Sequence, residues 1–306
     1  MTTKIIKTKW LTYKKTMTPS IRMWPRQITA YEQILPGFQK VFPEPDASHF
    51  PYTILIPEEQ LALFRKQGAK MLCLYGEKLD IYEVVQNNAV LTSYPLHEVI
   101  SCEYGSILLQ SWLTLHTPSK PITIHFNSVR EHLFKPIIAA FRPSASVENG
   151  VNSRNSRQNA LLKLEFLRKD NLKYLNIGIK SLLPDSKLLG FVYQPDIHLF
   201  KKRIFKKPVL IKYLTCHLSL LTDKELILIH ESKPTKGKKE EVYEAIFMYI
   251  PHHHIERISF EVPSAKTNTT MAVMLPGNKC LKRIFLRETA VNLDQFQKRC
   301  IEFHQC

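Results

Sequence analysis

The sequence predicts a mainly β fold of the α+β class, in which two antiparallel β modules follow one another and each ends in an amphipathic helix. Three observations lead to this prediction. Apolar residues recur in short runs typical of strands, the same landmarks occur twice in the same order, and a helical apolar pattern follows the last strand of each copy. The chain has 306 residues and 44 % of them are apolar, which suits about two packed domains.

Composition divides the chain into four blocks. Residues 1–49 form a basic N-terminal arm that contains five prolines. Residues 50–142 are dense in apolar side chains and form the first module. Residues 143–160 are rich in serine and asparagine, which is a linker composition. Residues 161–306 form the second module.

The duplication is predicted from four landmarks. Each module has a strand, a polar turn and a strand, which is the pattern of a β-hairpin, at residues 74–81 and again at residues 221–228. An opening apolar run occurs at residues 55–64 and again at 182–191. A proline-led segment that reaches Ile-Ser-x-Glu occurs at residues 95–103 and 251–261, and a terminal helix at residues 129–141 and 293–303. Ser128 and Glu131 match a capping box at the start of the first helix, and Pro136 predicts a kink or break within it.

A curved antiparallel sheet followed by one amphipathic helix resembles the pleckstrin-homology-like (PH-like) and GRAM-like superfold in its bacterial versions. The segment at residues 221–227 looks like the early hairpin of such domains, and the proline-led segments resemble their middle strands. The resemblance covers about two thirds of the chain, without the arm and the linker, and extends to uncharacterised bacterial proteins. It implies a non-enzymatic binding module for lipid head groups, peptides or other domains.

The positive charge is concentrated in the second half of the chain. The net charge is +16, yet residues 50–142 carry eight basic and eight acidic side chains, whereas residues 143–306 carry 27 basic and 16 acidic ones. Such an asymmetric surplus indicates an anionic partner for the second module. A membrane is the first expectation and an acidic protein the alternative. Nucleic acid comes third, since aromatic and basic residues alternate in the N-terminal arm.

The most informative local feature is a basic tract at residues 199–208. Its candidate binding residues are five cations and three apolar neighbours: Lys201, Lys202, Arg203, Lys206, Lys207, Phe200, Ile204 and Phe205. No acidic residue occurs between Asp196 and Asp223. Each cation near an anionic bilayer contributes about 1 kcal/mol, and the apolar side chains can insert at the interface. The tract therefore predicts a site for an anionic surface.

The alignment of the two modules makes this tract an insertion, because the first module passes quickly from Phe64 to Leu74. By position alone, the resemblance places it in the first inter-strand loop, which in PH-like domains often meets acidic head groups. The alternative interpretation is structural. The phenylalanines then pack inward, and the lysines line a solvated edge that discourages strand pairing.

No pattern indicates catalysis or a bound cofactor. The chain has no Gly-rich phosphate loop, no Gly-x-Ser-x-Gly elbow and no His-Glu-x-x-His. His252, His253 and His254 are read as part of a strand or loop without a metal, because only alternate residues of a strand share a face and no Cys or Asp completes a site. We therefore expect a protein that is not an enzyme.

The compartment is predicted from what the sequence does not contain. No run of about 18 apolar residues occurs, and the first ten residues lack the apolar core of a secretory signal. Six cysteines are spread along the chain without a Cys-x-x-Cys pair, and Cys73 and Cys216 are expected to be buried free thiols. We expect a cytoplasmic protein with peripheral attachment to the membrane.

Overall fold

The computed structural model confirms a mainly β protein of the α+β class with antiparallel sheets. It forms two compact units: residues 1–99, 108–112 and 123–141 belong to the first unit, and residues 100–107, 113–122 and 142–306 to the second. The described residues are 3–7, 24–43, 50–62, 65–86, 88–107, 110–143, 150–204, 207–231, 244–262 and 268–304.

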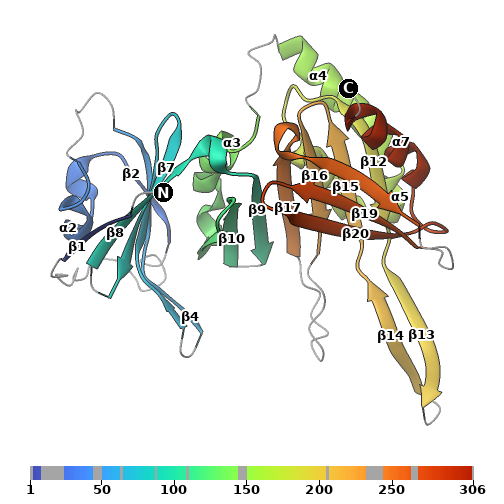
Figure 1. The fold of residues 1–306 in the computed structure, drawn as a ribbon, viewed down its shortest axis with the longest axis horizontal. Coiled ribbons are helices and arrows are strands. Elements are labelled where there is room, and N and C mark those ends of the chain that lie inside the picture. Colours follow the sequence, from blue (N-terminus) through green and yellow to red (C-terminus); the bar gives the residue numbers. More distant parts are fainter. Residues whose placement is uncertain are drawn as a thin grey trace. The chain divides into compact units, whose positions relative to one another are not determined.

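An antiparallel sheet of the order β1-β8-β7-β6-β3-β2 forms the body of the first unit (Figure 1). Its core is aromatic: Phe38 on helix α2 and Tyr82 on β7 are fully buried, with their ring centroids 6.2 Å apart. Parts of the N-terminal arm join this unit, since β1 pairs with β8 and β2 with β3. The elements are β1 (Thr3–Lys7), β2 (Arg26–Ile28), η1 (Tyr31–Gln33), α2 (Pro36–Gln39), β3 (Tyr52–Ile56), β4 (Glu59–Ala62), β5 (Arg65–Gln67), β6 (Lys70–Leu74), β7 (Lys78–Val85), β8 (Asn88–Pro95), η3 (Leu96–Glu98), η4 (Ser128–Phe134) and α3 (Lys135–Ala140).

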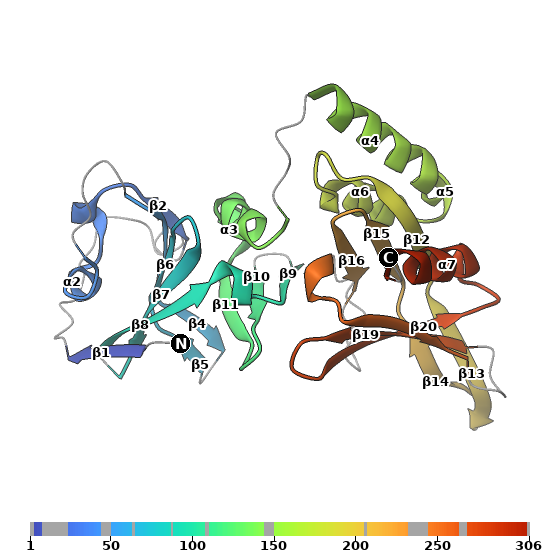
Figure 2. The same ribbon diagram turned by 45° about the horizontal axis from the view of Figure 1, so that its top comes forward.

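Two sheets form the body of the second unit, and a separate two-stranded hairpin is added to them. One contains β9, β17, β16, β15 and β12 as hydrogen-bonded neighbours, and its complete strand order is β11-β10-β9-β17-β16-β15-β12. The other contains β18, β19 and β20, and Figure 2 shows β19 and β20 side by side. The elements of the second unit are β9 (Ser101–Ile107), α4 (Gly150–Leu164), α5 (Leu167–Asp170), α6 (Leu172–Ser181), β12 (Leu188–Gln194), β13 (Ile197–Ile204), β14 (Lys207–Leu214), β15 (His217–Thr222), β16 (Glu225–His230), β17 (Glu244–Pro251), η5 (His252–His254), β18 (Arg257–Glu261), β19 (Asn268–Leu275), β20 (Lys279–Leu286) and α7 (Leu293–His304). The residues of β10 (Gln110–His116) and β11 (Ile122–Asn127) are divided between the two units.

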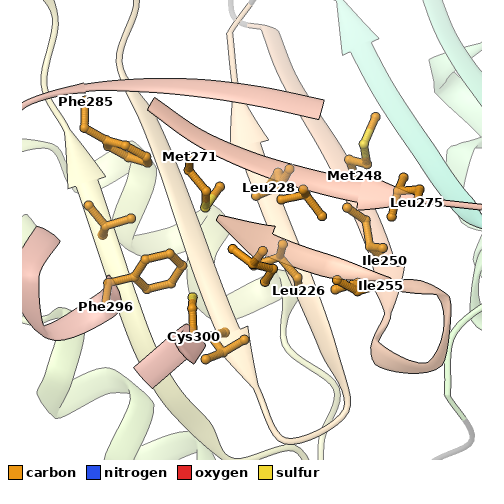
Figure 3. Packing of buried hydrophobic residues seen from close by; sticks show 14 of the residues in the cluster. Leu226, Leu228, Met248, Ile250, Ile255, Met271, Leu275, Phe285, Phe296 and Cys300 are labelled. Atoms are coloured by element: carbon orange, nitrogen blue, oxygen red, sulfur yellow. The ribbon is translucent and has the colours of Figure 1, made fainter. Parts of the chain in front are cut away.

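The apolar core of the second unit lies between these two sheets and is covered by helix α7 (Figure 3). Leu226 and Leu228 on β16 meet Met271 on β19, while Phe296 and Cys300 reach the core from α7. All five side chains are at most 2 % exposed. Burial of one large apolar side chain contributes about 1.5–3 kcal/mol, so this core is a main source of stability.

The two units differ from the two expected modules. Strand β9 pairs with β17 from Glu244↔Ile107 to Tyr249↔Cys102, and this pairing places residues 100–107 in the second unit. The expected linker at 143–160 also differs, because residues 150–160 belong to helix α4, which packs with α6 and against β12. The polar composition of this segment, with little apolar periodicity, predicted a linker. The helix instead packs on the second unit through its buried side chains Ala160 and Leu164.

The same order of elements nevertheless occurs twice. In each copy a strand is followed by a two-stranded hairpin, three antiparallel strands, a short 3-10 turn, three more strands and a helical segment. The first copy runs from β3 to α3 and the second from β12 to α7. Corresponding strands also pair alike, since β3 pairs with β6 as β12 pairs with β15.

Local details of the first helical segment differ from the prediction. The N-cap is Asn127 rather than Ser128, and the Asn127 side chain accepts a hydrogen bond from the Val129 N–H at 3.0 Å. The segment starts as the 3-10 helix η4 and continues as α3, with Pro136 in the first turn of α3. The helical segment is thus broken next to this proline, as predicted. A proline is tolerated in the first turn of a helix because its missing N–H would have no intrahelical acceptor there.

Candidate functional site

The basic tract lies in the hairpin of β13 and β14, which forms a separate two-stranded sheet. Figure 1 shows that this hairpin extends away from the rest of the second unit. The predicted residues Phe200, Lys201, Lys202, Arg203 and Ile204 belong to β13, and Lys207 begins β14. Phe205 and Lys206 lie outside the described residues. The structure thus brings the described backbone of the predicted site into one continuous hairpin.

The register of this hairpin is irregular. Ile204 pairs with Lys207 and Arg203 with Pro208, but the register shifts on both sides of Phe200. Such bulges increase the twist of a two-stranded ribbon. A hairpin outside the main sheets has unpaired backbone groups on its outer edges, and lysines at an edge discourage pairing with another chain.

The base of the hairpin is fastened by hydrogen bonds to the body of the second unit. The Asp196 carboxylate accepts from the Cys216 N–H at 2.7 Å, and the Tyr174 hydroxyl on α6 donates to the Cys216 carbonyl oxygen at 2.8 Å. The Gln194 side chain accepts from the Leu286 N–H at 2.7 Å and donates to the Thr289 hydroxyl at 2.9 Å. Hydrogen bonds therefore fix the chain at both ends of the hairpin, just before β13 and just after β14.

The tract lengthens a hairpin that is present in both copies and does not add a new element to the second. The first copy also carries a hairpin between its first and second main strands, formed by β4 and β5, with Glu59 paired with Gln67. The shorter hairpin was missed because its strands are short and polar and lack apolar alternation. The tract is thus a longer form of a feature present in both copies.

A second group of candidate residues was missed by sequence reasoning, and we name it the arginine–histidine cluster: Arg283, His230 and His217. Arg283 on β20 donates from Nη2 to His230 Nδ1 at 3.0 Å, and from Nη1 to the Ile229 carbonyl oxygen at 3.3 Å. His217 pairs with His230 in the register of β15 and β16, and its ring lies 5.0 Å from that of Phe285. The cluster therefore joins both sheets of the second unit.

Burial controls the electrostatics of this cluster. It lowers the pKa of His217 to about 3, and the nearby charge of Arg283 acts in the same direction. Burial followed by the Arg283 charge lowers the pKa of His230 to about 4, and burial lowers the pKa of Arg283 to about 10. At neutral pH the cluster therefore contains one cation and two neutral imidazoles. No single sequence motif could reveal it, since Arg283 is 53 positions away from His230.

The three consecutive histidines form the 3-10 turn η5. Of the two expected possibilities, a strand or a loop, the structure therefore does not show the strand. His252 Nε2 lies 2.8 Å from the Thr222 carbonyl oxygen, and its ring lies 4.3 Å from that of Phe303. Burial, and then the neighbouring His253, lowers the pKa of His254 to about 4. Within the described ranges, no three His, Cys, Asp or Glu side chains are grouped as a metal site.

The predicted buried thiols are present. Cys73 and Cys216 are free and buried, and burial raises the pKa of each thiol to about 12. Both therefore stay protonated at neutral pH and behave as small apolar side chains.

None of the helices in the described part of the chain is long and apolar enough to cross a membrane. Comparison with known proteins adds no functional assignment. The chain matches no protein-family model, and no curated protein shows significant similarity to its sequence.

Proposed function

We propose that this chain is a non-enzymatic binding protein built from two tandem PH-like modules, and that its second module attaches to anionic membranes through the β13–β14 hairpin. The repeated order of elements supports the tandem arrangement, since each copy has a strand, three further strands, a three-stranded group and a terminal helical segment. Strand pairings that correspond between the copies support it further.

The observation that carries the membrane proposal is the composition of a projecting hairpin. Residues 197–214 contain six Lys or Arg residues and no acidic residue. The five cations of the predicted tract would contribute about 5 kcal/mol at an anionic surface, before losses to geometry and salt, at about 1 kcal/mol each. Attachment of this kind is weak, reversible and sensitive to salt, because the Debye length is about 8 Å at physiological ionic strength.

A membrane is favoured over an acidic protein by the apolar residues within the tract. Phe200, Ile204 and Phe205 are interspersed with the cations, and a combination of aromatic and basic residues suits the interface between head groups and acyl chains. An acidic protein partner can use the same cations without apolar insertion. Apolar substitution therefore separates the two classes of partner.

Co-sedimentation with vesicles tests the proposal. Wild-type protein should bind phosphatidylserine-containing vesicles at low salt, ignore phosphatidylcholine vesicles, and dissociate as salt rises. The variant with Lys201, Lys202, Lys206 and Lys207 replaced by Gln should lose most binding. A control with the same charge change replaces four exposed lysines elsewhere in the second unit, which are Lys169, Lys180, Lys187 and Lys282.

Three results would refute the membrane proposal. Wild-type protein that ignores anionic vesicles at low salt is the first, and equal loss of binding in the hairpin variant and the control is the second. The third is full vesicle binding by a variant with Phe200 and Phe205 replaced by Ser, combined with tighter binding to an acidic polypeptide or to single-stranded nucleic acid.

A further inference from the structure

The arginine–histidine cluster contains a positive charge for which the described part of the chain supplies no counter-ion. A guanidinium offers five N–H donors, and within the described residues Arg283 bonds only to the Ile229 carbonyl oxygen and to His230. The adjacent acid, Glu231, is paired with Lys173 at 2.6 Å. A poorly solvated charge without an ionic partner is costly, so the surroundings of Arg283 favour a negatively charged ligand.

Buried polar atoms lie on the same two sheets as this charge, and one of them, on His217, is near enough to feel the charge of Arg283. His217 Nε2, Ser219 Oγ and Thr269 Oγ1 have no hydrogen-bond partner among the residues that the structure describes, and their residues are 4 %, 0 % and 1 % exposed. Ser219 shares a face of β15 with His217, because the two are separated by one residue, and Thr269 lies opposite Phe285 in the β19–β20 register. Buried polar groups are nearly always paired in native proteins, so these three atoms call for partners that the described residues do not supply.

The hydrogen bonds also define the protonation of both imidazoles. Arg283 can only donate, so His230 Nδ1 must accept and the ring proton of His230 resides on Nε2. His217 Nδ1 lies 3.0 Å from the Thr215 carbonyl oxygen, which can only accept. The proton of His217 therefore resides on Nδ1, and its Nε2 is a hydrogen-bond acceptor. The cluster consequently offers several donors and one buried acceptor.

This set of donors and one acceptor matches an oxyanion that carries a proton. The oxygens of a phosphate group accept hydrogen bonds from Arg283 and His230, and its P–O–H donates to His217 Nε2. Arginine suits this task because its planar fork matches phosphate oxygens. A sulfate ion is unprotonated at neutral pH and leaves His217 Nε2 without a donor. Arg283 and His230 are each partly exposed to solvent, which gives the ligand an approach.

We propose that the arginine–histidine cluster binds a singly protonated phosphate group, in the form of inorganic phosphate or of a phosphomonoester. The site is separate from the β13–β14 hairpin and does not depend on the membrane proposal. A phosphomonoester can come from a soluble metabolite or from a lipid head group, and both sources present the same chemistry to Arg283.

Equilibrium dialysis of the full chain against phosphate at neutral pH tests the site directly and needs no variant. Saturable binding at millimolar concentration is expected, together with a rise in Tm that sulfate at the same ionic strength does not reproduce. Arg283→Gln should abolish both effects. Arg257→Gln is the control, because Arg257 is an exposed arginine on β18 of the same sheet.

The assignment is overturned if wild-type protein does not bind phosphate, if Arg283→Gln binds as well as Arg257→Gln, or if sulfate binds as tightly as phosphate. Should Arg283→Gln fold poorly, Arg283→Lys retains the charge without the fork and should weaken phosphate binding at least tenfold, roughly the loss of one charge-assisted hydrogen bond.

Two further measurements identify the source of the phosphate and separate the two proposals. Selective loss of binding to phosphatidic acid vesicles in Arg283→Gln, with phosphatidylserine binding unchanged, assigns a lipid phosphomonoester. Loss of dialysis binding with both vesicles unchanged assigns a soluble phosphate compound. The Lys→Gln hairpin variant should keep its phosphate binding, so failure of the membrane proposal leaves this one standing.

Discussion

Removal of Arg142 should destabilise the second unit strongly, because it leaves Glu225 as a buried charge without a partner. Glu225 is fully buried and the Arg142 side chain is 10 % exposed. Arg142 Nε lies 3.2 Å from each carboxylate oxygen of Glu225, and Nη2 donates to the Ser181 carbonyl oxygen at 2.6 Å. The guanidinium also lies 4.0 Å from the Tyr249 ring centroid.

The expected size of this effect follows from the desolvation of the carboxylate. Breaking a buried ion pair by removal of one partner costs about 3–5 kcal/mol, so we expect Arg142→Met to lower the free energy of unfolding by this amount. Replacement of both partners by apolar residues, as in Arg142→Met with Glu225→Leu, should recover most of the loss. Urea unfolding of the two variants measures the difference.

The pH dependence provides a second readout. Burial already raises the pKa of Glu225 against the opposing effect of Arg142, and loss of Arg142 should raise it further. A carboxyl group whose pKa is raised on folding destabilises the protein as pH increases through its folded pKa. Arg142→Met should therefore regain stability as pH is lowered toward 5, by up to about 1.4 kcal/mol per pH unit. A cost below about 1 kcal/mol, or no rescue by the double variant, would refute this reasoning.

Two further predictions concern the second unit. Burial and the Arg283 charge hold the pKa of His217 near 3 and that of His230 near 4, so below about pH 6.5 the unfolded chain binds more protons than the folded one. The free energy of unfolding should therefore decrease as the pH is lowered below about 6.5, by up to about 1.4 kcal/mol per pH unit for each ring. Urea unfolding midpoints at a series of pH values measure this decrease. Gly178→Val should cost about 1–3 kcal/mol, because a Cβ at Gly178 would lie 3.0 Å from a Leu218 methyl group; an unchanged Tm would contradict the close packing of α6 on β15.

Local signals in the sequence predicted the elements well. The hairpins expected at residues 74–81 and 221–228 correspond to β6–β7 and β15–β16, because alternating apolar residues around a polar turn specify this structure over a few positions. The apolar positions expected at 293–303 lie in α7, where Phe296 and Cys300 are fully buried. These features depend on neighbours in sequence, which the sequence displays directly.

Pairings between distant segments could not be predicted. The apolar pattern of β9 shows that it is a strand but does not show that β17 is its neighbour, since any exposed edge could accept it. Arg142 was assigned to the end of the first module, yet its partner is Glu225, 83 positions later. The arginine–histidine cluster was missed for the same reason.

The histidine run illustrates the limit of motif reasoning. Three consecutive histidines suggested either a strand or a loop, and the structure places them in the 3-10 turn η5. Pro251, which precedes them, fixes the backbone φ as the strand ends, so a turn follows at once. The histidine side chains alone did not indicate whether the segment is a strand or a turn.

Hydrogen exchange of the full chain, with and without vesicles, tests the membrane proposal most directly. Amide exchange in residues 197–214 should slow in the presence of phosphatidylserine vesicles at low salt and return to the free rate at high salt. The shorter β4–β5 hairpin should exchange at the same rate throughout, since its cations are Arg65 and Lys66 beside Glu59. Unchanged exchange in residues 197–214, or protection confined to other segments, would contradict attachment through the β13–β14 hairpin.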